Sequence, residues 1–226
     1  MVTELYAPNW FHGVDSVFDI VSVIAGLLVA FYSYKVYKLT SQKKYKYFSL
    51  SFFLIALSFI MKILMNTAIY SKVFNKAVVG FLTITVQTSQ RIGWINHYAS
   101  IFYMFLMLLA FAILLIMAFR IRDEKLIFLF VYFAFITALL SKVSYFIFHI
   151  TLALFLSYLF IYYYKNFSRV RSKSSMTVAY SFFLIFLSQV VFIFMLFSKG
   201  VYVLGETLQL LGYLLLLLTF ILVLKK

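Results

Sequence analysis

Residues 51–58 read SFFLIALS, and residues 181–188 read SFFLIFLS, so one octapeptide recurs with a single change 130 positions later. The match extends upstream without a gap, and 11 of the 27 positions from 32 to 58 are identical. The identities outside the octapeptide are Tyr32, Tyr34, Lys35 and Lys43, which align with Tyr162, Tyr164, Lys165 and Lys173. An ungapped match that keeps Tyr, Lys and Ser in register indicates an internal repeat.

Apolar runs of about 20 residues recur along the chain, which has 226 residues, of which 65% are hydrophobic. This pattern predicts an all-α integral membrane protein with seven transmembrane helices that follow an extracytoplasmic tail at residues 1–13. The predicted spans in the bundle of residues 14–226 are 14–39, 47–70, 95–120, 126–141, 143–164, 176–197 and 201–224. The chain contains no cysteine, which excludes disulfides and thiolate chemistry.

The basic residues predict the orientation of these spans. Fourteen Lys and Arg residues lie in or beside one set of connections, five lie in the opposite set, and Lys62 lies within a span. Because Lys and Arg concentrate in cytoplasmic loops, the N-terminus is expected outside and the C-terminus inside, in a multi-pass protein of the cell membrane. Topology thus accounts for the net charge of +14, and no nucleic-acid partner is expected.

The two copies of the octapeptide lie in spans that run in the same direction, so the predicted repeat is parallel. The first unit covers about 14–120 and the second about 143–224, and a linker helix at about 126–141 separates them. This 3+1+3 plan, with helices 1–3 and 5–7 around helix 4, predicts a pseudo-two-fold axis along the membrane normal.

In this plan the chain resembles the seven-helix bundles of transporters, opsins and G-protein-coupled receptors, and small seven-helix membrane proteins of archaea. The resemblance covers most of the chain and is topological. Opsins carry retinal on a lysine of the seventh helix, but residues 201–224 contain no lysine, so no retinal is expected. The 3+1+3 sugar transporters use prolines as hinges, whereas the single proline here, Pro8, lies in the tail.

The longest predicted loop covers residues 71–96 on the outer side and is a candidate lid over a pocket. Within it, residues 82–88 read LTITVQT, an alternation with β-branched residues that favours a strand or hairpin. An ordered loop or a surface-lying amphipathic segment is the alternative to a lid.

The strongly polar side chains within the predicted spans all lie in the outer half of the membrane. Each ionisable group at the centre of a bilayer costs about 2.5–3.5 kcal/mol, so these groups are expected to face the interior or a water-filled cavity. His12 and Asp15 are expected to be solvated at the outer interface. The predicted ligand-binding residues are Asp19, Lys62, Asn66, His97, His149, Gln189, Glu206 and Gln209.

Lys62 is the central member of this layer, because an unpaired ammonium at that depth is costly. Its nitrogen is expected to point into the bundle and to pair with Asp19 or Glu206, although a side chain that snorkels outward is the alternative. At the offset of 130, Asp19 aligns with His149, so both are expected to face one central space.

Three functions fit these features. The first is a receptor-like or sensory protein that binds a small polar ligand or ion and signals to a cytoplasmic partner at the inner basic loops. The second is a small-solute or ion transporter. The third is an intramembrane metal-dependent hydrolase, with zinc ligands drawn from His12, Asp19, His97, His149 and Glu206. The chain has no HExxH pair, so an enzyme is not favoured and no cofactor is expected.

Overall fold

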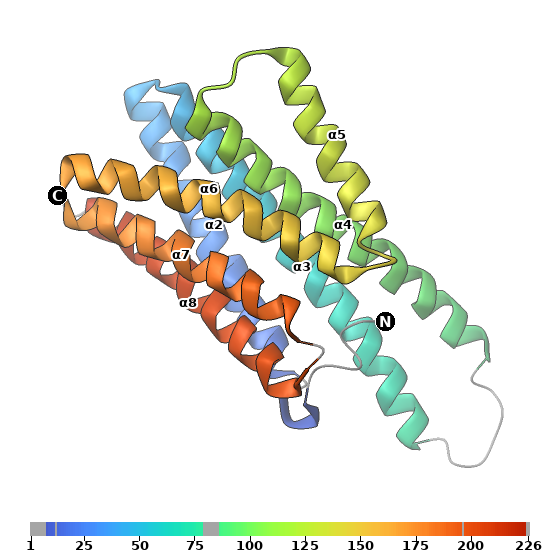
Figure 1. The fold of residues 1–226 in the computed structure, drawn as a ribbon. Helices are drawn as coiled ribbons and strands as arrows, with labels where there is room; N and C mark the ends of the chain where they lie inside the picture. Colours follow the sequence, from blue (N-terminus) through green and yellow to red (C-terminus); the bar gives the residue numbers. More distant parts are fainter. Residues whose placement is uncertain (1–7, 12, 79–85, 196, 225–226) are drawn as a thin grey trace.

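The computed structural model describes residues 8–11, 13–78, 86–195 and 197–224, and these residues form helices without any strand. After the 3-10 turn η1 (Asn9–Phe11), the α-helices follow one another along the chain (Figure 1). They are α2 (Val14–Thr40), α3 (Lys43–Val78), α4 (Val86–Phe119), α5 (Glu124–Leu140), α6 (Tyr145–Val170), α7 (Lys173–Ile193) and α8 (Lys199–Leu224).

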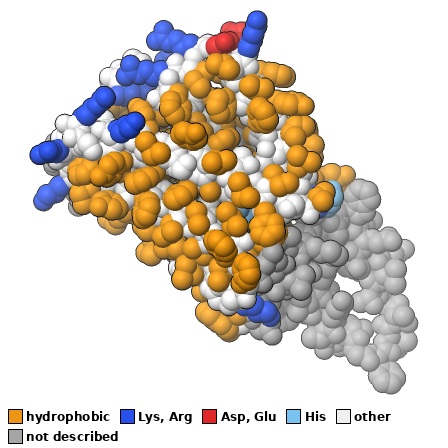
Figure 2. Space-filling view, in the orientation of Figure 1, with side chains coloured by type: hydrophobic (Ala, Val, Ile, Leu, Met, Phe, Trp, Pro, Cys, Tyr) orange, Lys and Arg blue, Asp and Glu red, His pale blue; other side chains and the backbone are white. Residues whose placement is uncertain are grey.

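Six of these helices, all except α5, are long and apolar enough to cross a membrane. Their exposed side chains are largely hydrophobic, and exposed Lys and Arg residues gather at one end of the molecule (Figure 2). We call this end the basic end; it contains the α2–α3, α4–α5 and α6–α7 connections, and the opposite end is the site end. The chain is therefore a polytopic membrane protein.

The helix ends at the basic end follow local rules. Helix α2 stops because Ser41 adopts a left-handed conformation (φ 55°) and its N–H bonds to the carbonyl of Tyr37 at 2.8 Å. Helix α6 stops in the same way at Arg171 (φ 50°), whose N–H bonds to the carbonyl of Phe167 at 2.7 Å. The following helices begin two residues later, at Lys43 and Lys173.

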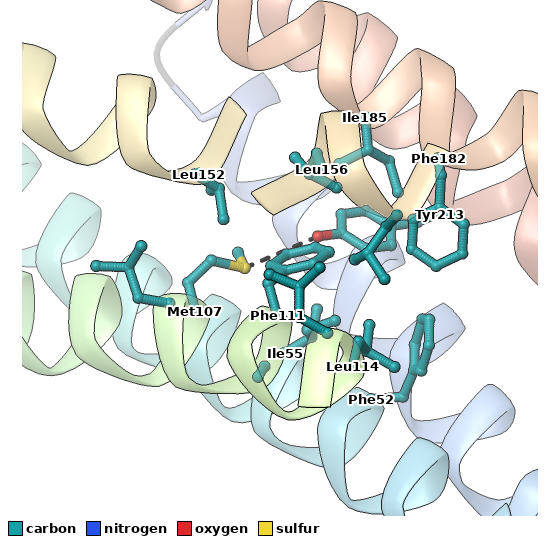
Figure 3. Close-up of a cluster of buried hydrophobic side chains, with 14 of the residues drawn as sticks. Phe52, Ile55, Met107, Phe111, Leu114, Leu152, Leu156, Phe182, Ile185 and Tyr213 are labelled. Carbon is teal, nitrogen blue, oxygen red and sulfur yellow. Dashed lines mark hydrogen bonds between the residues drawn. The ribbon is translucent and has the colours of Figure 1, made fainter. Parts of the chain in front are cut away.

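Six helices form a ring in the order α2, α3, α4, α6, α7 and α8, and α8 packs back on α2. Helix α5 lies outside this ring, on α4 and the edge of α6 (Figure 1). The ring is filled by fully buried hydrophobic side chains (Figure 3). These side chains include Phe52, Ile55, Phe111, Leu114, Phe182, Ile185 and Tyr213.

Helix α8 approaches α7 closely because glycines face the contact. A Cβ atom at Gly212 would lie 2.5 Å from Cγ1 of Ile185 and 3.2 Å from the carbonyl oxygen of Ser181. Small residues allow this approach in membrane proteins, where packing rather than water drives helix association.

We expect Gly212→Ala to lower the stability of the protein by about 1–3 kcal/mol, because the new methyl group overpacks a filled contact. The matched control is Gly200→Ala, whose Cβ would meet only the Ser198 hydroxyl, at 3.7 Å. Thermal unfolding of the purified proteins measures both. Equal melting temperatures for the two variants would contradict the tight α7–α8 contact.

Each predicted span overlaps one of the helices α2 to α8, six of which are long and apolar enough to cross a membrane, and the long outer loop is shorter than expected. Residues 86–88, predicted as part of a strand, belong to α4 and so are helical. They continue the long α4 helix, which outweighs a short alternation of β-branched residues. Residues 79–85, the rest of the predicted strand, lie outside the described residues.

Candidate functional site

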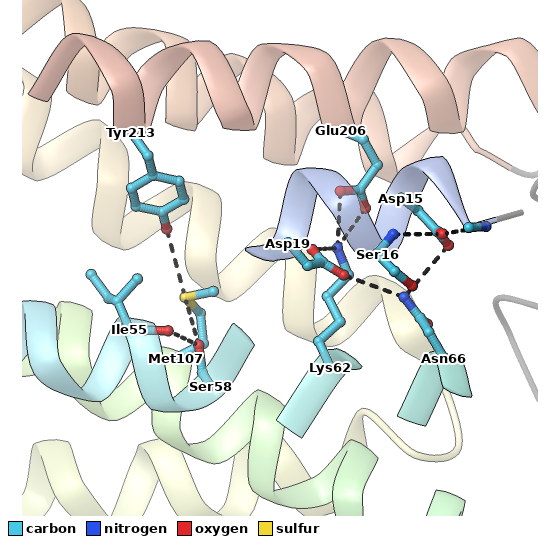
Figure 4. A network of polar contacts seen from close by, with 11 residues as sticks. Asp15, Ser16, Asp19, Ile55, Ser58, Lys62, Asn66, Met107, Glu206 and Tyr213 are labelled. Atoms are coloured by element: carbon cyan, nitrogen blue, oxygen red, sulfur yellow. Dashed lines mark hydrogen bonds and ion pairs between the residues drawn. The ribbon is translucent and has the colours of Figure 1, made fainter. Parts of the chain in front are cut away.

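A network of buried charges joins α2, α3 and α8 toward the site end (Figure 4). The Nζ atom of Lys62, on α3, donates to Oδ1 of Asp19 on α2 at 2.8 Å. It also donates to both carboxylate oxygens of Glu206 on α8, at 2.7 and 2.9 Å. The three residues are only 1–4% exposed. Lys62 therefore points into the bundle, and it pairs with both carboxylates that the sequence offered as alternatives.

Two further side chains extend this network toward the start of α2. Asn66, one turn beyond Lys62, donates from Nδ2 to Oδ2 of Asp19 at 3.3 Å and to Oδ2 of Asp15 at 3.5 Å. Oδ1 of Asp15 accepts from the backbone N–H of Gly13 at 3.0 Å and of Ser16 at 2.7 Å. Asp15 and Asp19 are four residues apart on α2, and Lys62 and Asn66 are four apart on α3, so each pair lies on one face of its helix.

Asp15 is 2% exposed, so the expectation that it is solvated at the interface is wrong. The turn η1 precedes this helix end, and its Phe11 is buried and packs edge-on against Phe18 and Tyr202. The network consequently buries three carboxyl groups, Asp15, Asp19 and Glu206, against the single ammonium of Lys62. The excess of acidic groups makes this region negative.

A cavity of about 120 Å³ adjoins the network. Lys62 and Glu206 form one part of its wall, and His149 and Phe148 on α6 form another. The other ten lining residues include three methionines and four aromatic rings, with Tyr103 on α4 and further rings of α6, α7 and α8. These further rings are Tyr145, Phe192 and Tyr202. Since an apolar cavity of about 150 Å³ holds benzene, this space accepts a molecule of about five heavy atoms.

One basic side chain marks the end of the cavity that reaches the surface. Lys142, in the turn between α5 and α6, is exposed and lines the cavity together with Ser100. Its Nζ atom donates to the Ser100 hydroxyl at 3.0 Å and to the carbonyl of His97 at 3.4 Å. Partial burial lowers the pKa of the Lys142 ammonium below its ordinary value.

His149 and Gln189 form a neutral pair between α6 and α7. Nδ1 of His149 lies 2.8 Å from Oε1 of Gln189, and because an amide oxygen only accepts, Nδ1 is the donor. Nε2 of Gln189 then donates to the hydroxyl of Ser188 at 3.2 Å. This pair holds the imidazole ring in the cavity wall.

Toward the basic end, the polar region stops at a weakly polar contact below the cavity. The hydroxyl groups of Ser58 and Tyr213 both lie near the sulfur of Met107, at 3.7 and 3.8 Å (Figure 4). All three residues are at most 1% exposed. Met107 and Tyr213 also belong to the packed core of Figure 3.

Of the eight residues predicted to bind ligand, Asp19, Lys62, Asn66 and Glu206 lie in the charged network, and His149 and Gln189 form a separate pair. Lys62, His149 and Glu206 line the cavity. His97 is exposed and contributes only its backbone carbonyl, whereas Gln209 is buried on α8 beside Tyr213. Sequence reasoning missed Ser100, Tyr103, Lys142 and Tyr202, because their residue types are common at membrane interfaces and carry no spacing signal.

The hydrolase hypothesis gains no support from this geometry. Among the described residues, no group of three His, Asp or Glu side chains is placed to hold a metal ion. His12, one of the predicted zinc ligands, lies outside the described residues.

Comparison of the chain with protein-family models, curated proteins and solved structures finds no match.

Proposed function

We propose that this protein is a membrane carrier for a small polar solute, built from two three-helix units that enclose the cavity. The observation that carries the proposal is the position of the cavity. Its wall combines α3 and α4 of the first unit with α6, α7 and α8 of the second. Carriers with internal repeats hold their substrate at the interface between the repeats.

The order of helix contacts supports two related units. Exchanging α2 with α6, α3 with α7 and α4 with α8 converts each contact of the ring into another contact of the ring. Helix α5 is left over as the linker. With 17 residues it is at the lower limit for a membrane-spanning helix, and we propose it as the seventh span.

Side chains 130 positions apart in the two units support the same relation. Phe52 and Phe182 are both fully buried, as are Ile55 and Ile185. The hydroxyls of Ser58 and Ser188 each donate to the carbonyl three residues earlier, at 2.7 Å. The left-handed helix ends at Ser41 and Arg171 also have this offset.

The two units differ in charge where they meet. At the junction of α2 with α8, Lys62 ties both helices together through Asp19 and Glu206. The positions that correspond to Asp19 and Lys62 in the second unit are His149 and Phe192, which carry no such ion pair. We propose that the charged junction opens and closes during transport while the neutral junction acts as the pivot.

We propose that the basic end lies in the cytoplasm, and the exposed basic residues at that end support this orientation. We expect a cysteine introduced at Ser172, in the α6–α7 connection, to be unreactive toward an impermeant thiol reagent added to intact cells. It should react after the membrane is permeabilised. The native chain has no cysteine, so no background labelling interferes. Labelling of Ser172→Cys in intact cells would contradict the orientation.

A receptor-like or sensory protein is the second candidate, and the exposed cations of the basic end favour it (Figure 2). Such a surface suits an acidic cytoplasmic partner. In that case the cavity would bind its ligand without transferring it.

Counterflow into proteoliposomes tests the carrier. Vesicles loaded with an unlabelled small polar solute should accumulate the labelled solute, several times more than empty liposomes do. Panels of amino acids, polyols and small amines supply the solutes. Binding of a solute to the protein without counterflow of the same solute would reject the carrier in favour of the receptor.

A further inference from the structure

The negative part of the cavity wall is suited to a cationic group. Glu206 lines the cavity, and each of its oxygens can accept a hydrogen bond beyond the one from Lys62. The three buried carboxyl groups of the network, against one ammonium, add to the negative charge behind it. A small ammonium group in the cavity would offset this excess.

The hydroxyl of Tyr202 also favours a ligand at the part of the cavity wall that Glu206 forms. Tyr202 lies one turn before Glu206 on α8, is 3% exposed and lines the cavity. Its hydroxyl has no hydrogen-bond partner among the residues that the structure describes. A buried polar group without a partner is costly, and a ligand that bonds to it would recover that cost. The neighbouring aromatic faces also attract an ammonium group through cation–π interactions.

The opposite charge lies at the surface end of the same cavity. Lys142 donates there to the neutral oxygens of Ser100 and His97, and no carboxylate pairs with it among the described residues. A partly buried ammonium bonded only to neutral acceptors is suited to receive an anion. The cavity thus has a negative pole deep in the bundle and a positive pole near the surface.

We infer that the cavity binds a small zwitterion in which one or two carbon atoms separate an ammonium group from a carboxylate. The ammonium lies at Glu206 and Tyr202, and the carboxylate lies at Lys142, whose ammonium has one N–H beyond its bonds to Ser100 and His97. The size of the cavity, about 120 Å³, sets an upper limit near that of the smallest amino acids. The inference rests on the proposed function in that it names the solute class of the same cavity.

This assignment also links binding to the charged junction. The ammonium of the ligand competes with Lys62 for Glu206, whereas Asp19 keeps its bond to Lys62 and does not line the cavity. A ligand bound in the cavity therefore weakens the ion pair between Lys62 on α3 and Glu206 on α8. The ion pair between Lys62 and Asp19 on α2 remains.

Calorimetric binding to the full-length protein in nanodiscs tests the inference with four probes of similar size. These are glycine, propylammonium, propionate and the neutral propionamide. We expect glycine to bind at least tenfold more tightly than any of the other three. Propionate or propionamide binding as tightly as glycine would overturn the inference, and so would the absence of glycine binding to folded protein.

Variants assign the two poles. Lys142→Gln, in an exposed turn, should weaken glycine binding at least tenfold and leave propylammonium binding unchanged. Glu206→Gln should weaken both, and Tyr202→Phe should weaken both severalfold. Lys199→Gln, an exposed lysine away from the cavity, is the matched control for Lys142 and should bind glycine as the wild type does.

Asp19→Asn should weaken glycine binding by a factor at least three times smaller than Glu206→Gln does, although both variants remove one ion pair of Lys62. Equal losses would mean that the network matters only for folding, which would overturn the inference. Glycine binding without glycine counterflow rejects the carrier and leaves the zwitterion site. Counterflow of another solute without glycine binding rejects the zwitterion site alone.

Discussion

Replacing Lys62 by methionine is expected to destabilise the protein by about 3–5 kcal/mol, because it leaves buried carboxylates without their counter-ion. Asp19 and Glu206 both bond to the Lys62 ammonium, within 2.9 Å. Neither residue is more than 3% exposed, so water does not replace the lost partner. Denaturant unfolding in detergent, followed by tryptophan fluorescence, measures the loss.

Neutralising Asp19 or Glu206 together with Lys62 should restore stability stepwise. Because Lys62 bonds to two carboxylates, Lys62→Met combined with Asp19→Asn or with Glu206→Gln should recover part of the loss. The triple variant should recover most of it, since a missing ion pair costs less than a lone buried charge. A triple variant no more stable than Lys62→Met alone would contradict the pairing.

The second large loss of stability is expected when phenylalanine is replaced by alanine at either of two core positions that lie 130 residues apart. Phe52 and Phe182 are each fully buried. Phe→Ala costs roughly 3–5 kcal/mol in soluble cores, and we expect about 2–3 kcal/mol here because lipid is as apolar as the core. The two variants should lose similar amounts if the two units are equivalent.

Phe53→Ala is the matched control, because the Phe53 side chain is 50% exposed on the surface of the helix bundle. It leaves no internal cavity and should change stability by less than about 1 kcal/mol. The unfolding midpoints of Phe52→Ala, Phe182→Ala and Phe53→Ala, measured under one set of conditions, test whether the two units are equivalent. A loss at Phe182 several times that at Phe52 would argue against equivalent units.

The fold could be predicted in large part because the membrane restricts a chain to few structures. Runs of apolar residues locate the helices, so the first span, predicted at 14–39, differs from α2 by one residue. The cost of a buried ammonium likewise predicted that Lys62 points inward. Counting residues along a span gives depth, and depth alone placed Asp19, Lys62 and Glu206 in one layer.

Depth does not give the direction in which a side chain faces around the bundle, and this limited the prediction of the site. Lys142 and Tyr202 are distant in sequence and line one cavity only because the α5–α6 turn and α8 both border it. Asp15 is buried although it lies in the first turn of α2, and no spacing rule predicts this. Both features depend on tertiary packing rather than on local pattern.

Access to the cavity from the two sides of the membrane tests the carrier most directly. Met104, on α4, lines the cavity, and the native chain has no cysteine, so Met104→Cys places a single thiol there. In proteoliposomes of one orientation, an impermeant thiol reagent should label it when added to either side, because a carrier exposes its site alternately. Labelling from the site end alone, with and without solute, would contradict the carrier and leave a receptor.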